Sequence, residues 1–506
     1  MAYTTDRCRP DVGSPRSHFL SPVRGLKQAL FCLSLWGAAW LLSLWASPAN
    51  AQGATRVFAV VTDQASAGAE RPAITSRNRA DPNAVAVALG LPPDTMQAIL
   101  AHGPWPQPFT PDPGNRASGQ AAAVALGGRL FFDRRLSHDG RMACASCHLP
   151  EKGFSDGRVR SLGHDGQPLD RNAQGLLDAR LSHWFGWDGA ADSLWAFSMR
   201  PLNHPRELAL PADALRTLFE RDAGLACLRQ AAFGSAAGTS AHERAAHPDE
   251  RLRVQVAKAL AAYVETLDSG RTRFDDFRDA LARGDLKQAR AYPADALRGL
   301  QRFVGEGRCN LCHTGPAFSH GEFHELGRPF MAAPGRPDPG RHGGIQAVLA
   351  DPYNRLGPWV DTPAQPLADD PAVRTRHLSG SHRNFGEFKV PGLRGAVFTA
   401  PYFHDGSAAT LSDVVAHYST LDSERLHADG EAILKPLQLT PRESADLVAF
   451  LRTLSQPAAV QRPGQVPVQI QRQPPASILP SVDTQRAAWA RTARALSCPP
   501  PARAAP

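Results

Sequence analysis

Two copies of the pattern Cys-x-x-Cys-His constrain this 506-residue chain more than any other feature, one at residues 144–148 and one at 309–313. The pattern is typical of c-type haem attachment, in which the two cysteine sulfurs form thioethers to the porphyrin and the adjacent histidine ligates the iron. The sequence therefore predicts two covalently bound c-type haems. Their attachment and iron-binding residues are Cys144, Cys147 and His148 for the first haem and Cys309, Cys312 and His313 for the second.

A zinc site is the main alternative explanation of such cysteine pairs. Structural zinc needs four converging ligands, whereas each histidine here directly follows its own cysteine pair. Two copies with different interior residues, 165 residues apart, favour haem. A pair of haems indicates redox chemistry. An iron with both axial positions filled by protein passes electrons only, whereas an open position lets peroxide bind.

The first 51 residues have the features of a secretory signal peptide. Arg24 and Lys27 precede an apolar run over 29–45, and Ala49-Asn50-Ala51 has the small residues of a cleavage site. We therefore expect cleavage after Ala51, a periplasmic product and no membrane span after cleavage. Retention of the run as a membrane anchor is the alternative. Export agrees with haem attachment, which takes place outside the cytoplasm.

The composition argues against a nucleic-acid partner. Loss of the leader removes five basic and two acidic residues and lowers the formal charge from +8 to +5. No stretch of the sequence combines concentrated basic residues with aromatic ones, so we interpret the excess of positive charge as belonging to a solvated surface. Of the six cysteines beyond the leader, four belong to the haem motifs. Cys227 and Cys498 are left, and the sequence leaves open whether they pair.

The spacing of apolar residues predicts a mainly α fold, with two cytochrome c-like haem domains packed together and extensions at both ends. About 455 residues follow the leader, more than one core usually holds. Helices are expected over 119–132, 251–267 and 296–304, and over 441–451 behind a capping box at Thr440 and Glu443. The expected segments are a signal peptide (1–51), an N-terminal extension (52–115), a first haem domain (116–250), a second haem domain (251–456) and a disordered tail (457–506), with 486–496 as its one candidate helix.

Three further segments resemble the bacterial diheme cytochrome c peroxidase/MauG family. Leu-Phe-Phe-Asp-Arg-Arg-Leu-Ser at 130–137 is similar to the approach to that family's first haem. Phe-Lys-Val-Pro-Gly-Leu-Arg at 388–394 and Thr-Ala-Pro-Tyr-Phe-His-Asp-Gly at 399–406 are similar to its second-haem signature. The resemblance covers residues 116–455 and leaves the first hundred residues, 329–382 and the tail unexplained.

This resemblance implies a peroxidatic first haem and an electron-transferring second haem. It implies that Trp187 lies between the haems and helps electrons cross, and that Pro201 and Glu207 belong to the peroxide-binding pocket above the first haem. A carboxylate in that place can carry a proton from one peroxide oxygen to the other. Each residue also has an ordinary alternative, a core aromatic for Trp187 and a surface carboxylate for Glu207.

The resemblance also implies a calcium ion between the haems. Asn172, Thr399 and Pro401 match its oxygen ligands, and calcium is a hard cation that prefers oxygen. His164 stands sixteen residues after His148, at the spacing of the family's displaceable distal iron ligand. Its sequence context is closer to the MauG-like branch, which leaves the first iron five-coordinate. An iron ligand and a free, solvated histidine therefore both remain open.

The second haem departs from the peroxidase pattern. Peroxidases of the family place a methionine ligand fourteen residues after the histidine of the His-Asp-Gly signature, which is His404 here, and this chain has Tyr418 at that position. Beyond His313 the only methionine is Met331, in a loop rich in proline and glycine. We therefore predict Tyr418 as an iron ligand, with a tyrosine packed in the core as the alternative.

Local sequence favours an inward position for this tyrosine. Thr410 can cap a helix that begins at Leu411, with Asp413 at its third position, and Leu411, Val415 and Tyr418 then share one face. A phenolate is a hard, anionic ligand that stabilises ferric and higher states, whereas a thioether favours ferrous iron. The exchange makes the second haem a poorer electron acceptor and a better store of oxidising equivalents.

Together these features predict a diheme oxidoreductase that uses hydrogen peroxide. Peroxide is expected to bind iron at the His148 haem, and the oxidising equivalents are shared through Trp187 with the second haem. Electrons return from a small periplasmic redox protein or from side chains of a protein substrate, and Tyr418 favours the MauG-like substrate oxidation. A non-enzymatic diheme electron-transfer cytochrome is the alternative, and the Glu207 and Pro201 match argues against it.

Overall fold

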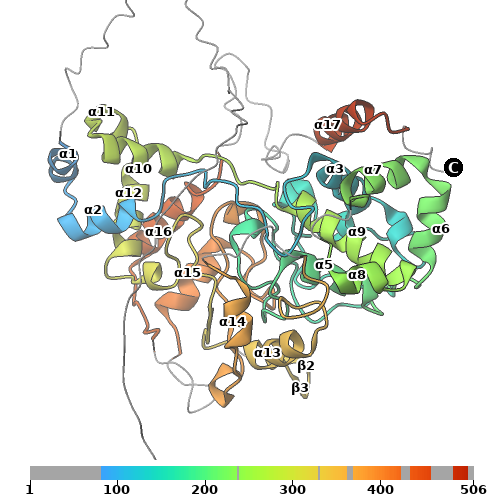
Figure 1. Ribbon diagram of the computed structural model, residues 1–506. Helices are drawn as coiled ribbons and strands as arrows, with labels where there is room; N and C mark the ends of the chain where they lie inside the picture. The colour runs from blue at the N-terminus through green and yellow to red at the C-terminus, as the bar shows by residue number, and fades with distance from the viewer. Residues whose placement is uncertain are drawn as a thin grey trace, which may run out of the picture. The chain divides into compact units, whose positions relative to one another are not determined.

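The computed structural model describes residues 81–235, 239–328, 331–361, 369–422, 433–456 and 482–499. The signal peptide predicted over 1–51 lies outside these residues. The described part is mainly helical, as predicted (Figure 1). Its strands are β1 (Phe323–His324), β2 (Met331–Ala333), β3 (Arg336–Pro337) and β4 (Phe388–Lys389), which pair antiparallel as β1–β4 and β2–β3. None of the described helices is long and apolar enough to cross a membrane.

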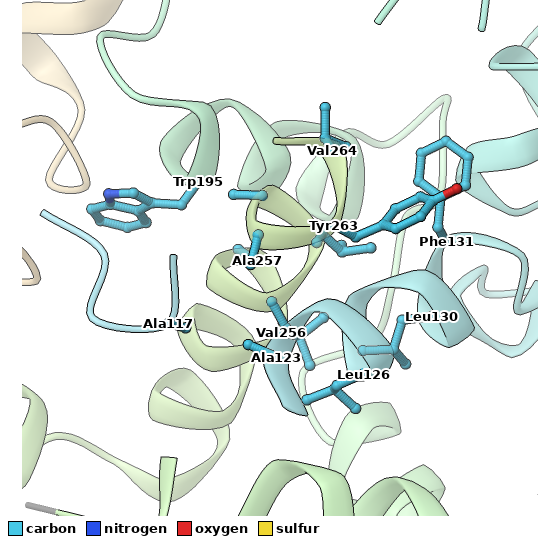
Figure 2. Packing of buried hydrophobic residues seen from close by; sticks show 14 of the residues in the cluster. Ala117, Ala123, Leu126, Leu130, Phe131, Trp195, Val256, Ala257, Tyr263 and Val264 are labelled. Carbon is cyan, nitrogen blue, oxygen red and sulfur yellow. The ribbon is translucent and has the colours of Figure 1, made fainter. Parts of the chain in front are cut away.

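The first hydrophobic core surrounds helix α9 (Pro248–Val264), whose residues from Arg253 onward are buried on all sides. Helix α3 (Ala121–Phe131) packs along α9 so closely that a Cβ added at Gly127 would lie 1.9 Å from the Ala259 carbonyl oxygen. Figure 2 shows side chains of both helices in this core, with Trp195 beside them. Helices α5 (Leu194–Asn203), α6 (Ala214–Arg221) and α7 (Ala223–Phe233) also contribute to it. Helix α8 (Ala241–Ala245) carries the buried Glu243.

This core corrects the predicted domain boundary between residues 250 and 251. That boundary falls inside α9, and the buried side chains of α9 belong with those of α3 and α5. A helix that is buried on all sides must be enclosed by other elements. The sequence shows the helix but not the elements that enclose it.

The second core lies around α12 (Ala294–Val304) and α16 (Pro441–Arg452), which approach each other at Gly299. Two helices of the predicted N-terminal extension, α1 (Pro82–Ala88) and α2 (Pro93–Leu100), add Val85, Met96 and Ile99 to this core. This part of the extension therefore belongs to the second core. The remaining helices of the region are α10 (Arg273–Arg283), α11 (Leu286–Ala289) and α15 (Leu411–Ser419).

The segment 329–382, which the sequence leaves unexplained, carries α13 (Arg341–Ala350) and α14 (Ala372–Arg376) and is anchored to the first core by buried charges. Lys258 of α9 is fully buried, and its Nζ lies 2.8 Å from an Asp361 carboxylate oxygen. Arg116 pairs with both Asp361 and Glu243, so every charge in this cluster has a partner. Buried charges are tolerated only when paired in this way.

The C-terminal segment confirms the candidate helix predicted over 486–496 and shows that this part of the tail is packed on the first core. Residues 482–495 form helix α17 (Val482–Ala495), which packs on α3 through Trp489. A disulfide joins Cys498, just beyond the helix, to Cys227 of α7, which settles the pairing that the sequence leaves open. The tail's Pro- and Gln-rich composition predicts disorder. Helix α17 is nevertheless held on the first core by the buried side chains of Trp489 and Ala493 and by the disulfide of Cys498. Residues 457–481 lie outside the described residues.

Candidate functional site

Both Cys-x-x-Cys-His motifs line one cavity of about 1410 Å³. All six motif residues lie on its wall, and none of the four cysteines forms a disulfide. The first motif forms the single-turn helix α4 (Cys144–Cys147) and the second the 3-10 helix η4 (Cys309–Leu311). In both, the backbone N–H of the histidine donates to the backbone carbonyl of the first cysteine, at 3.0 Å for His148 and 2.9 Å for His313. Each turn thus brings its two sulfurs and its imidazole together.

The two motif histidines are held by equivalent hydrogen bonds. His148 Nδ1 donates to the Phe154 carbonyl at 2.7 Å, and His313 Nδ1 donates to the Phe318 carbonyl at 3.0 Å. With Nδ1 committed to a carbonyl, Nε2 is the nitrogen left for a metal. Burial lowers the pKa of both imidazoles, to about 4 for His313, which keeps them in the neutral, metal-binding form.

Sequence reasoning missed the residues that hold these histidines. Phe154 and Phe318 both have positive φ, 61° and 55°, a conformation rare outside glycine. In each case this turn aims the backbone carbonyl at the histidine. The sequence signal for this turn is a Phe-Ser pair after each motif, at Phe154-Ser155 and Phe318-Ser319.

Glu207 and Pro201 line the cavity on the side of the first motif. Pro201 lies inside α5, and its carbonyl accepts a hydrogen bond from the Leu208 N–H, which folds the following loop back over the helix. Burial raises the pKa of Glu207, while the neighbouring His204 and Arg200 oppose that rise. This carboxyl group is therefore poised to exchange a proton nearer to neutral pH than an exposed glutamate would be.

Trp187 also lines the cavity and connects segments that carry the two motifs. Its Nε1 donates to the Asn172 carbonyl at 2.9 Å, and its own carbonyl accepts from the Lys389 N–H of β4 at 2.8 Å. Burial lowers the pKa of Lys389 to about 8. One hydrogen bond thus fixes the indole and the other fixes the backbone of Trp187.

The three residues predicted to bind calcium all line the same cavity. The Asn172 N–H donates to the His404 carbonyl at 2.9 Å, and its side-chain amide donates to the Arg158 carbonyl at 2.7 Å. Asn172, Thr399 and Pro401 together offer oxygen atoms without sulfur or imidazole. A donor set of this kind fits a hard cation such as calcium.

Tyr418 lies on α15, whose predicted cap is confirmed. The Asp413 N–H donates to Thr410 Oγ1 at 3.2 Å, and the Thr410 N–H donates to an Asp413 carboxylate oxygen at 2.8 Å. The predicted inward face is also confirmed, because Leu411, Val415 and Tyr418 line the cavity. Burial and the thiols of the second motif raise the pKa of Tyr418. The iron-ligand role of Tyr418 stays a prediction.

Two other residues that the sequence offers as iron ligands, Met331 and His164, lie away from the cavity. Met331 is 53% exposed on β2, so it does not replace Tyr418. His164 is not among the cavity-lining residues. Its Nε2 donates to the Pro205 carbonyl at 2.8 Å, and its ring packs against His138. Of the two roles that the sequence leaves open for His164, this geometry favours a histidine that does not bind iron, because its Nε2 is engaged with the backbone.

Comparisons with known proteins show which chains this one is similar to. A family model described as di-haem cytochrome c peroxidase matches residues 121–283. The methylamine utilization protein MauG of Methylorubrum extorquens is 33% identical over 341 residues, which cover 67% of this chain and 80% of that protein. The cytochrome-c peroxidase IdrP1 of Denitromonas iodatirespirans is 33% identical over 359 residues, which cover 69% and 85%. The solved diheme peroxidase BthA of Burkholderia thailandensis aligns with 24% identity and a TM-score of 0.49, covering 69% of this chain and 87% of that one.

Proposed function

The chain belongs to the di-haem cytochrome c peroxidase family, and from this premise we propose that it is a periplasmic c-type diheme enzyme whose oxidant is hydrogen peroxide. The observation that carries the proposal is the single cavity onto which both Cys-x-x-Cys-His motifs open. Two bound haems would supply iron that takes up peroxide and exchanges single electrons. The residues of the chain decide where peroxide enters and where the electrons come from.

On the first side, Cys144 and Cys147 attach the haem, and His148 binds iron through Nε2. Glu207 on the cavity wall is placed to accept a proton from one peroxide oxygen and to deliver it to the other, while the haem iron would supply the electrons for cleavage of the O–O bond. Its raised pKa suits both halves of this transfer. His164 is hydrogen-bonded to the Pro205 carbonyl and lies outside the cavity on this side.

On the second side, Cys309 and Cys312 would attach the haem, and His313 and Tyr418 would hold its iron. Burial raises the pKa of Tyr418, and iron bound to its oxygen would oppose this and favour the phenolate. Trp187 carries electrons between the two haem sites. A calcium ion held by Asn172, Thr399 and Pro401 would steady Trp187 through the hydrogen bond from its indole to Asn172.

The electrons that complete the reaction come from outside the haem sites. An axial tyrosine lowers the reduction potential of the second haem relative to an axial methionine. A low potential disfavours uptake of electrons from a high-potential cytochrome and favours storage of oxidising equivalents. We therefore propose side chains of a protein substrate as the electron source, with a small periplasmic redox protein as the second candidate.

Spectroscopy of the purified, haem-loaded protein tests the proposal. We expect two covalently attached haems by mass, and one high-spin and one low-spin ferric haem by EPR. Peroxide should produce a near-infrared absorption band that reports electronic coupling between the haems, and Tyr418→Phe and Tyr418→Met should both lose it. Two low-spin haems unchanged by peroxide would contradict the proposal. Fast turnover with reduced cytochrome c and no such band would favour the ordinary peroxidase.

A further inference from the structure

A row of aromatic rings leads from the first haem motif to the C-terminal helix. The Phe131 ring lies 6.4 Å from that of His148 and 5.1 Å from that of Tyr263, centroid to centroid. The Trp489 ring of α17 lies 5.6 Å from that of Tyr263. These are the separations of aromatic rings in direct contact. Figure 2 shows Phe131 of α3 and Tyr263 of α9 with their rings together.

Tyr263 lies directly behind the cavity wall. It is 1% exposed, and Leu260 and Val264, its neighbours on the same helix, both line the cavity. Cys144 of the first haem motif packs against the hydrophobic cluster that contains Tyr263. An oxidising equivalent at the first haem is therefore close to an oxidisable phenol, and the next ring in the row is an indole.

The position of Trp489 is fixed by three independent contacts. A Cβ added at Gly128 of α3 would lie 2.4 Å from Trp489 Cε2, so a glycine is required for the indole to reach this depth. The Tyr263 hydroxyl donates to Gln485 Oε1 on α17 at 2.8 Å. The disulfide between Cys498 and Cys227 ties down the end of the same segment. These contacts hold the indole over the phenol in one defined arrangement.

We propose that Tyr263 and Trp489 form a one-electron relay that connects the first haem with the surface helix α17, and that Trp489 holds the resulting radical when no external donor is present. This inference rests on the proposed reaction with peroxide. One peroxide takes up two electrons and two protons to give two water molecules. One electron comes from the Trp489 indole through Tyr263, and the other comes from the second haem through Trp187.

The surroundings of the two rings decide which one keeps the radical. Oxidation of a phenol releases its proton, and the Tyr263 hydroxyl faces only the amide oxygen of Gln485 among the described residues, which is a weak base. Trp489 lies on helix α17, and an indole, unlike a phenol, can lose an electron while it keeps its N–H proton. While Tyr263 is oxidised, its hydroxyl proton can shift along the hydrogen bond to Gln485 Oε1, and it returns when Trp489 supplies an electron. Tyr263 therefore passes the electron on, and Trp489 keeps the unpaired spin.

The test adds peroxide to the haem-loaded, full-length protein without any reductant. Freeze-quench EPR should detect a tryptophan radical, and peptide mass spectrometry should find oxygen added to Trp489. Trp489→Phe should lose the radical. Tyr263→Phe should lose the oxidation of Trp489, because phenylalanine keeps the packing but is not oxidised under these conditions. Trp359→Phe is the matched control, a buried tryptophan of the same core outside the row, and it should behave as wild type.

Two results would overturn the relay. One is equal oxidation of Trp489 in the wild type and in Tyr263→Phe. The other is a wild-type protein that consumes peroxide but shows neither a tryptophan radical nor a modified Trp489. A protein whose haem absorption does not respond to peroxide would instead overturn the proposed function, and the relay with it. An intact disulfide and an unchanged circular dichroism spectrum verify that each variant is folded.

Discussion

At the scale of single residues, Glu207 is the group whose protonation should control the reaction with peroxide. Its carboxylate must be free to accept the first proton, and burial raises its pKa above the ordinary value of 4.5. The rate constant for the reaction with peroxide should therefore fall as pH decreases through this raised pKa, at a higher pH than for an exposed glutamate. Stopped-flow measurement of haem absorption across the pH range checks this.

Replacement of the same carboxylate separates proton transfer from binding. Glu207→Gln keeps the shape but cannot accept a proton, so the rate constant should drop by about 10²- to 10⁴-fold and lose its acid limb. Glu151→Gln, outside the cavity, is the control and should keep both. An unchanged pH profile in Glu207→Gln would assign the proton transfer to another group.

His102 shows how a residue outside both haem motifs can influence an iron ligand. Its ring stacks on Phe318 at 4.3 Å, and the Phe318 carbonyl is the acceptor for His313 Nδ1. His102→Ala should loosen this hydrogen bond, make the imidazole a weaker donor to iron and raise the reduction potential of the second haem. Spectroelectrochemical titration measures the shift. The exposed His377→Ala is the control, and equal potentials in both variants would contradict the expectation.

At the scale of helices, the disulfide should decide whether α17 stays on the first core. Cys498→Ser removes a cross-link between residues 271 positions apart, and losses of this kind cost about 2–5 kcal/mol. We expect α17 to become the first site of limited proteolysis, with the rest of the fold intact. Cys227→Ser should behave identically, because each variant breaks the same bond. Protection of α17 in both variants would show that Trp489 alone suffices.

The helices also show what sequence patterns can and cannot predict. The cap of α15 and that of α16 follow from local rules, and both are present in the structure. The assignment of α9 to the first core and the packing of α17 on α3 depend on contacts between residues far apart in the sequence, which no local pattern contains. The cavity position of a side chain was predictable where its spacing from a motif identifies the residue, as for Tyr418. It was not predictable that the backbone conformation of Phe154 directs its carbonyl to His148.

At the scale of the whole molecule, the buried charges around Lys258 join the segment 329–382 to the first core. Lys258→Met leaves Asp361 and Glu243 to share Arg116, and removal of one partner from a buried ion pair costs about 3–5 kcal/mol. Chemical denaturation should show this loss. The exposed Lys287→Met should stay near wild type. A loss below 1 kcal/mol would mean that Arg116 compensates for the missing charge.

The predicted calcium site links the two halves of the cavity, so removing the ion should uncouple the haems. Asn172 is predicted to hold calcium and accepts the hydrogen bond from Trp187, and Thr399 and Pro401 come from the second-haem region of the chain. Chelation should therefore weaken the near-infrared band that peroxide produces, while both haems stay attached because their thioethers do not depend on calcium. Added calcium should restore the band, and magnesium should not, because its smaller shell needs near-octahedral geometry. A full band after chelation would show that coupling through Trp187 does not depend on a metal at this site. Elemental analysis of the untreated protein would then tell whether calcium binds there at all.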